Sequence, residues 1–566
     1  MDSSRGGAGG PVAAGGSVAI GGSATGTAGS TATGGGSGAE QAGSAGASGS
    51  GVAGSGPAGP CDLSGAPNAP VSKWASPNAD GTLSYAKLPD GSHIPDYSHA
   101  GYMGGGVAFP SPPIVSTIEP SGGEDAAVIQ KALDTAASLP INAGLRGVVL
   151  LAAGTYNVSS TLNIRASGVV LRGRGSGSGG TVMRVGGAPH TAIVISGSGD
   201  RSRAGEATTI TDAYVAAGAR SFRVEASGGF KVGDTVLVQR PVTSAWIEFM
   251  GMDNMVRNGK RQTWIGAGSV IESDRIIAGI AGNEVTLDAP LADSLDQKYL
   301  SPPGPKLVRY TFNGRIEQVG VEGIRLVAPK QAAGNASPQF TGVRLDAVQN
   351  GFVRDVVIEE FGFGMSVGDK SKWITIQDSA VLRTTPVDNS AGYPFQFAVT
   401  GQLTLLMNCR TSGEDAFAYV TQARVPGPNV VLGLTSNDGG SISPHQRWAT
   451  GLLVDSSTIS GGIDMMNRGY LGSGHGWTMG FGTVWNSTAA SFLVQLPPGA
   501  PNWAIGSSGT IEKRGAPGLP GGDVPNGIYD SHGKSVAPAS LYRAQLCGRL
   551  GPKALSNIDA NSTIPQ

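Results

Sequence analysis

Two histidines with neighbouring arginines are the residues of this chain best suited to chemistry. His445 lies in the stretch SPHQRWATG beside Arg447, and His475 lies in NRGYLGSGHGW together with Arg468. The 566-residue chain has only six histidines, and these two are 30 residues apart. Histidine exchanges protons near neutral pH, and the guanidinium of arginine matches a carboxylate. The pattern predicts proton transfer beside a bound carboxylate.

Cleavage of a uronic-acid polymer by β-elimination uses this combination of groups. A cation neutralises the C6 carboxylate so that the C5 proton becomes acidic, a base removes that proton, and an acid protonates the leaving oxygen. We assign His445 as the base, Arg447 and Arg468 as the cations, and His475 or Tyr393 as the acid. Further candidate contacts to the sugar are Trp448, Trp477, Trp246, Arg261 and Asp388.

Two other functions remain open from the sequence. Glycoside hydrolysis needs two carboxylates roughly 5 to 9.5 Å apart, and Glu414 or Asp415 could pair with Asp388 or Glu360. The third reading is a carbohydrate-binding or surface-structural protein without catalysis, because histidines in turns and tryptophans in cores are commonly structural. No metal site or cofactor is predicted; calcium stays open, although no clear site for it is present.

Short β-rich segments recur from residue 320 onward and predict how the histidines are positioned. Segments such as VEGIRLV, KWITIQDSAVL and GLLVDSSTIS begin about 20 to 30 residues apart, with no helical pattern between them. This repeat predicts an all-β, single-stranded parallel β-helix whose coils stack about 4.8 Å apart. His445 and His475 would then lie about one coil apart on the same face.

Two further elements interrupt this repeat. The apolar spacing in EDAAVIQKALDTAAS predicts an amphipathic helix over 126–139, which we expect to cover the open end of the stack. Between 201 and 305 the segments resemble hairpins and predict a small inserted β-module, which carries Trp246 and Arg261 to the surface that it overhangs.

Composition limits the partners and the compartment. The net charge is −1 and only 14% of residues are charged, without a basic stripe, so we expect no nucleic-acid partner. No apolar run is long enough for a membrane span. Residues 1–60 are almost wholly Gly, Ala, Ser and Thr, which predicts a flexible tether. We expect a secreted or cell-surface monomer whose signal is not in this chain. The sequence leaves open whether Cys61 and Cys547 pair.

The stretch EDAAVIQKALDTAAS…RGVVLLAAGTYNVSSTLNIRASGVVLRGRG resembles the capping helix and first coils of the pectate-lyase superfamily. The resemblance covers roughly 120–190, and the coil pattern extends it to about 510. It implies a right-handed parallel β-helix, and carbohydrate as the substrate class. The calcium-binding Asp-rich stretch of pectate lyases and the paired aspartates of polygalacturonases have no counterpart here, so no catalytic residue is carried over.

We therefore divide the chain into a tether at 1–60, an irregular segment at 61–120, the capping helix and first coils at 121–200, an inserted β-module at 201–305, main coils at 306–510 and a C-terminal extension at 511–566.

Overall fold

The computed structural model describes residues 61–562 except Asp62, Pro67, 335–336, 389–393 and Asp415. The region from Pro60 to Gln566 forms one compact unit. Tyr393, Asp415 and the predicted tether at 1–60 lie outside the described residues, and so does the side chain of Ala333.

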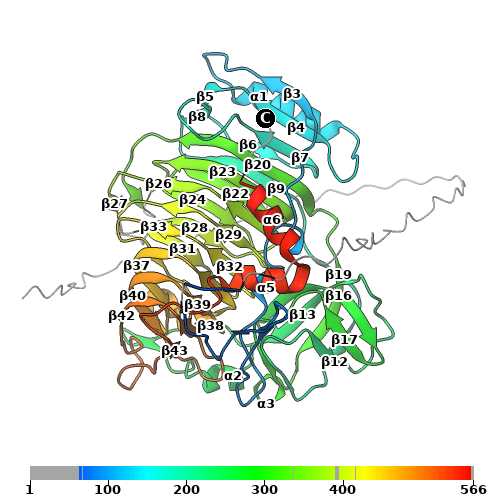
Figure 1. Ribbon diagram of the computed structural model, residues 1–566, viewed down its shortest axis with the longest axis vertical. Coiled ribbons are helices and arrows are strands. Elements are labelled where there is room, and N and C mark those ends of the chain that lie inside the picture. The colour runs from blue at the N-terminus through cyan, green and yellow to red at the C-terminus, as the bar shows by residue number, and fades with distance from the viewer. Residues whose placement is uncertain are drawn as a thin grey trace, which may run out of the picture. The chain divides into compact units, whose positions relative to one another are not determined.

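The described chain is a parallel β-helix in which each coil contributes strands to three stacks (Figure 1). The first stack contains β3 (Ile114–Ile118), β4 (Gly147–Leu151), β7 (Val169–Arg172), β20 (Ile316–Val327), β23 (Val348–Glu359), β25 (Lys372–Gln377), β29 (Leu405–Met407), β32 (Asn429–Leu432), β36 (Leu452–Asp455), β39 (Thr483–Trp485), β41 (Trp503–Ile505) and β43 (Ile528–Asp530).

The second stack contains β5 (Gly154–Val158), β8 (Thr181–Val185), the later halves of β20 and β23, β26 (Ala380–Leu382), β30 (Arg410–Thr411), β33 (Thr435–Ser436) and the first residues of β37 (Thr458–Met465), β40 (Thr488–Val494) and β42 (Ser508–Ile511). The third stack contains β6 (Leu162–Ile164), β9 (Thr191–Ser196), β22 (Thr341–Asp346), β24 (Phe363–Val367), β28 (Phe395–Val399), β31 (Phe417–Thr421), β34 (Ser441–Ile442) and the later residues of β37, β40 and β42.

In-register aliphatic side chains form the interior of the coils. A single ladder of the first stack joins one buried residue from each successive coil: Val321, Val353, Ile376, Leu406, Val431, Val454 and Val484. β-Branched and leucine side chains fit this pleated surface, and each coil covers the apolar edge of its neighbour. The predicted all-β parallel β-helix is confirmed.

The capping helix is also confirmed. Helix α1 (Ala126–Ser138) buries Ile129, Leu133 and Ala136 in the same core cluster as the first coils. The carboxylate of Asp125 accepts hydrogen bonds from the backbone N–H groups of Ser121 and Asn157, which fixes the start of the helix on the coil.

The predicted inserted β-module is present between β9 of the third stack and β20 of the first. Its antiparallel sheet contains β10 (Ser202–Thr209), β19 (Lys306–Thr311), β13 (Thr235–Pro241), β16 (Val270–Ala281), β17 (Glu284–Leu287) and β12 (Ser221–Arg223). Smaller elements are β11 (Tyr214–Val215), β18 (Leu295–Asp296), β14 (Val256–Arg257), β15 (Lys260–Arg261), α2 (Ser244–Phe249) and α3 (Gln297–Leu300). The module extends to Thr311, past the predicted boundary at residue 305, because β19 pairs with both β10 and β13.

Segments from both ends of the compact unit cover the outer face of the first stack. The short helices η1 (Tyr97–His99) and η2 (Tyr102–Gly104) lie there with α5 (Leu541–Leu550) and α6 (Pro552–Ala560), which are red in Figure 1. A disulfide joins Cys61 to Cys547 on α5, so this pairing, left open by the sequence, is settled. The remaining short elements are β1 (Ser76–Pro77), β2 (Leu83–Ser84), β21 (Ala333–Gly334), β27 (Val387–Asp388), β35 (Ala449–Thr450), β38 (Met479–Gly480) and α4 (Leu471–Gly474).

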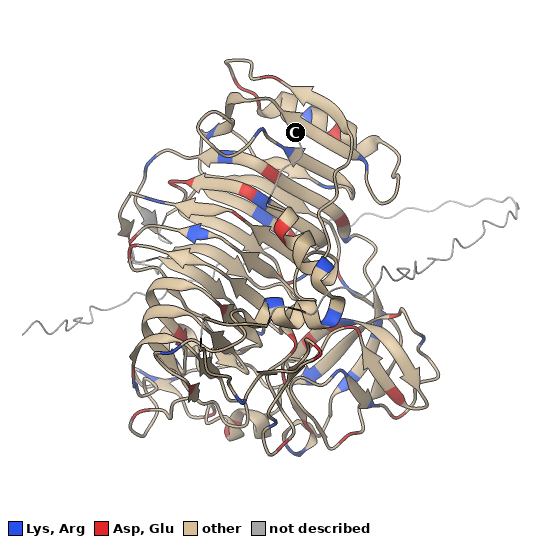
Figure 2. Cartoon of the chain, viewed as in Figure 1, with Lys and Arg blue, Asp and Glu red and all other residues tan. Residues whose placement is uncertain are grey.

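Charged residues of both signs are interspersed over the coils and the insert (Figure 2). Some are buried under the covering segments: Arg354, 3% exposed, forms ion pairs with Glu322, which also binds Arg172. In the described part of the chain no helix has the length and apolarity that crossing a bilayer requires.

Candidate functional site

The two candidate histidines lie in one column of turns, those that lead from the third stack back to the first. His445 follows β34 and precedes β36, and His475 follows β37 and precedes β39. The short strands β35 and β38 pair in parallel within this column, which sets the two turns one coil apart. The insert leaves the β-helix through a turn of the same kind, between β9 and β20.

The two imidazole rings contact each other. Their centroids are 4.6 Å apart and the rings meet edge to face, with an interplanar angle of 83°. His445 is partly exposed, and its Nδ1 lies 3.2 Å from Oε1 of Gln422, one coil earlier. A proton on Nδ1 would satisfy that oxygen and leave Nε2 as the basic nitrogen. His475 is 9% exposed, and its Nδ1 is buried without a hydrogen-bond partner.

The two arginines are held by backbone carbonyl groups around this pair. Arg447 donates from Nε to the carbonyl of Trp264 at 2.7 Å and from one terminal nitrogen to Ser473. Arg468 donates to the backbone carbonyl of His445 at 3.1 Å. Arg447 and Trp448 have positive φ angles of 50° and 65°, so this stretch turns sharply and stores backbone strain beside the histidine.

Burial and the nearby arginines keep both histidines neutral. Desolvation, followed by the charges of Arg468 and Arg447, lowers the pKa of His445 to about 4. Desolvation, the neighbouring His445 and the arginines lower the pKa of His475 to about 2. A neutral imidazole is the form that a base requires, so His445 is suited to that role. At neutral pH His475 carries no imidazolium proton, so its predicted role as the acid would fall to the weakly acidic N–H of the neutral ring.

The Gly-rich character of the second turn has a packing cause. A Cβ placed on Gly476 would lie 2.3 Å from the indole ring of Trp264, and Gly476 has a φ of 55°. The turn therefore needs glycine there because the insert approaches it closely.

The structure does not place the predicted tryptophan contacts where a sugar could stack on them. Trp448, Trp477 and Trp246 are 1%, 4% and 3% exposed, and they belong to the core cluster between insert and coils. The ring of Trp264 packs 4.8 Å from that of Trp246 and 5.8 Å from that of Trp448. These tryptophans fasten the insert over the turn column.

The other predicted residues lie away from the histidines. Arg261 is exposed on the β14–β15 hairpin and donates to the carbonyl of Asp253. Glu360, Asp388 on β27 and Glu414 lie in the connections between the second and third stacks, at the opposite end of the third-stack strands. A strand such as β31, with five residues, separates the two edges by about 15 Å.

Of the carboxylates predicted for hydrolysis, Glu360 is not suited to the role of acid. Glu360 accepts hydrogen bonds from backbone and hydroxyl groups of Thr384 and Thr385, which lower the pKa of its carboxyl group. A general acid needs a raised pKa. Asp388 and Glu414 are exposed.

Asp464, on β37, is a candidate that the sequence reasoning missed. The pairing of Ile442 with Ile463 sets Asp464 one coil from Ser443, two residues before His445. Burial raises the pKa of the Asp464 carboxyl group to about 6, against the opposing charges of Arg514 and Arg468. The one sequence signal for Asp464 was its position between two apolar residues, Ile463 and Met465, which are buried. Side chains alternate along a strand, so this position points the Asp464 side chain to the outer face.

Metal ligation is not evident in the resolved parts of 61–562, where no group of three or more His, Cys, Asp or Glu side chains could hold an ion.

Comparison with known proteins returned likenesses in three-dimensional structure alone. No protein-family model and no curated protein matches the chain. A tailspike protein of Pseudomonas phage LKA1 matches over 73% of this chain and 72% of its own, with 13% identity and a TM-score of 0.33. The A-module of a mannuronan C-5 epimerase of Azotobacter vinelandii matches over 73% of each chain, with 13% identity and a TM-score of 0.32.

A tailspike of Acinetobacter baumannii bacteriophage AP22, solved with a capsular saccharide, matches over 73% of each chain, with 12% identity and a TM-score of 0.30. Likenesses this low carry no argument about the chemistry of this chain. The strand pairing itself establishes the parallel β-helix, and the resemblance to the pectate-lyase superfamily stays a prediction.

Proposed function

We propose that this chain depolymerises an acidic, uronic-acid-containing polysaccharide by β-elimination, with His445 as the base. The observation that carries the proposal is the contact between His445 and His475 in stacked turns, with Arg447 and Arg468 around it. A neutral imidazole beside two guanidinium groups supplies a base and a carboxylate-neutralising charge together.

The proposed reaction begins when the uronate carboxylate approaches Arg468 and Arg447. Its negative charge offsets the arginines that lower the pKa of His445, so the imidazole becomes a stronger base when substrate is bound. Nε2 then removes the C5 proton, the C4–O4 bond breaks and a C4–C5 double bond forms. The carboxyl group of Asp464 gives its proton to the leaving O4, because a pKa of about 6 keeps part of it protonated.

We also propose that the protein works outside the cytoplasm. A structural disulfide between Cys61 and Cys547 supports this, because such bonds persist mainly in oxidising compartments.

The test uses the ultraviolet absorbance of unsaturated uronate products. Purified protein is incubated with alginate, pectate, glucuronan and glycosaminoglycans, and absorbance and reducing ends are followed together. Elimination gives both signals with at least one polymer, and His445→Ala removes both. His190→Ala, a histidine outside the turn column, is the matched control and keeps them.

Other results would overturn the proposal. Reducing ends without absorbance would indicate hydrolysis. No signal from any acidic polymer would favour a protein that binds carbohydrate without cleaving it.

A further inference from the structure

We propose that a cavity of about 400 Å³ on the first-stack side is a second binding site, for an acidic saccharide, apart from the His445–His475 pair. Five parts of the chain meet around it: η1 with His99, η2, the insert, the coil at β25 and helix α5. Its volume falls within the range of small-molecule sites, and pockets often form where separate units of a protein meet.

Trp373 supplies an apolar wall for one sugar ring. It is half-buried on β25, whereas Trp246, Trp264, Trp448, Trp477, Trp485 and Trp503 are buried. Its Nε1 faces Gly104, since a Cβ on that glycine would lie 3.8 Å from it. Met103, 48% exposed, lies beside it in the lining. An indole face with an adjacent polar edge suits the C–H face and hydroxyl groups of a sugar.

Two arginines in the lining are held in place by backbone carbonyls and, for Arg549, also by the hydroxyl of Ser98. Arg549 donates from Nε to Oγ of Ser98 at 2.8 Å and from one terminal nitrogen to the carbonyls of Ser98 and Gly104 at 2.7 Å. Arg220 donates to the carbonyl of Leu287 at 3.0 and 3.2 Å. In each guanidinium the second terminal nitrogen makes no hydrogen bond to the described residues and is available for a carboxylate.

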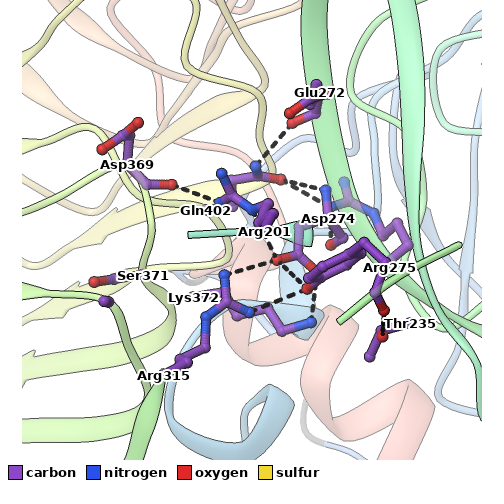
Figure 3. Close-up of polar contacts among 12 residues, drawn as sticks. Arg201, Thr235, Glu272, Asp274, Arg275, Arg315, Asp369, Ser371, Lys372 and Gln402 are labelled. Carbon is purple, nitrogen blue, oxygen red and sulfur yellow. Dashed lines mark hydrogen bonds and ion pairs between the residues drawn. The ribbon is translucent and has the colours of Figure 1, made fainter. Parts of the chain in front are cut away.

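A buried ionic network beside the cavity adds positive charge (Figure 3). The carboxylate of Asp274 on β16 accepts from Lys372 at 2.7 Å and from Arg315 at 2.9 Å, and Arg201 lies 3.7 Å away. One carboxylate thus faces three cations. Lys372 directly precedes Trp373, and its Nζ lies 4.5 Å from the centre of the Trp373 ring. The excess of these three cations over the single Asp274 carboxylate favours an anionic ligand.

Besides His99 and the two arginines, the lining holds one more ionisable group, Asp288, which favours a sugar over a compact inorganic anion. Asp288 accepts the backbone N–H of Ile276 through Oδ1 at 2.8 Å, and its carboxylate lies in the same lining as Arg220 and Arg549. A carboxylate repels phosphate, but it accepts hydrogen bonds from sugar hydroxyl groups. The site therefore combines an aromatic wall, cations for a carboxylate and an acceptor for hydroxyls.

Binding at this site is measured with diglucuronic acid, with cellobiose as its neutral counterpart and with inorganic phosphate as a simple anion. The full chain carries 5-fluorotryptophan, and Trp373→Phe assigns the Trp373 fluorine signal. We expect diglucuronic acid to shift that signal and to bind at least tenfold more tightly than cellobiose. Trp373→Ala and Arg220→Gln should each weaken binding at least tenfold, whereas Trp74→Ala, at another half-buried tryptophan, should not.

The His445→Ala variant separates this site from the proposed catalytic one. Unchanged binding and an unchanged Trp373 shift in that variant support a second site whether or not the chain cleaves polysaccharide. Loss of the shift in His445→Ala would overturn the proposal, and so would competition by phosphate at equal strength. Thermal unfolding of Arg220→Gln, Trp373→Ala and Trp373→Phe checks that each variant is folded.

Discussion

The lowered pKa of His445 determines the pH range in which this residue can act as a base. With a pKa of about 4 in the free protein, the imidazole is neutral above pH 5 and protonated below pH 3. We expect kcat/KM to be constant with respect to this group above pH 5 and to fall about tenfold per pH unit below 4. A pH–rate profile on the cleaved polymer measures this. If the Asp464→Asn variant still lost kcat/KM as the pH fell through about 6.5, the assignment of His445 as a base with a lowered pKa would be contradicted.

The pKa of His475 also links stability to pH. Its folded value of about 2 lies below the ordinary 6.5, so the unfolded chain binds more protons between these values. The contribution of His475 to stability is therefore complete above pH 6.5 and is lost as the pH falls toward 2. For each unit by which the pH falls between these values, we expect protonation of His475 to lower the free energy of unfolding by up to about 1.4 kcal/mol.

Denaturant titrations between pH 7 and 4 test this linkage. His475→Gln removes one titrating group from the turn and should flatten the slope. His190→Gln is the comparison at a site outside the turn column. An equal slope in the His475→Gln variant and the parent would contradict the linkage.

At the scale of single residues the sequence predicted the histidine pair but not its surroundings. The 30-residue separation of His445 and His475 matched one coil, so their contact followed from the repeat. The roles of Trp448 and Trp477 could not be predicted in this way. Their burial depends on where the insert folds back, and no periodicity in the chain records that contact.

The insert is the element that shapes the turn column, and its attachment rests on Trp264. This side chain is 1% exposed and donates from Nε1 to the carbonyl of Trp477 at 3.1 Å. We expect Trp264→Ala to lower the free energy of unfolding by about 3–5 kcal/mol, because a large buried ring leaves a cavity. Activity should fall as well, because without the indole ring the insert is less firmly attached and the backbone that carries the carbonyl of residue 264, which accepts from Arg447, can shift.

Equilibrium unfolding and kcat for Trp264→Ala give the two readouts. Trp74→Ala, at a half-buried tryptophan that packs on Trp503 and, among the described residues, makes no hydrogen bond or ring contact with the histidine turns, is the control and should leave kcat unchanged. A loss in Trp264→Ala below 1 kcal/mol would show that the insert is held by other contacts.

At the scale of elements, periodicity predicted the strands, the capping helix and the insert. The helical spacing of Ile129 and Leu133 placed α1, and alternating aliphatic residues placed the coils. The sequence did not show which two stacks a given turn connects. Strand lengths vary from two to twelve residues, and the longer strands pass from one stack to the next at positions that the sequence does not mark. Glu414 and Asp388 were therefore grouped with His445, although they lie at the other end of the third stack.

At the scale of the whole molecule, chain segments 486 residues apart are joined by the Cys61–Cys547 disulfide. The segments that it connects cover the first stack with Tyr102 and Phe109 packed on Phe352. The sequence left this pairing open, because three cysteines allow several arrangements and only the fold brings Cys61 to α5.

The disulfide should stabilise the folded chain by limiting the freedom of the unfolded one. We expect the Cys61→Ser/Cys547→Ser double variant to lose about 2–5 kcal/mol in the free energy of unfolding. A reductant should destabilise the parent by the same amount and leave the double variant unchanged. Cys409 is the internal comparison, because it is a buried free thiol whose pKa burial raises to about 12. Thiol titration should therefore find no reactive group in the native parent and one after denaturation without reductant. Three reactive thiols in the denatured, unreduced chain would show that the bond does not form.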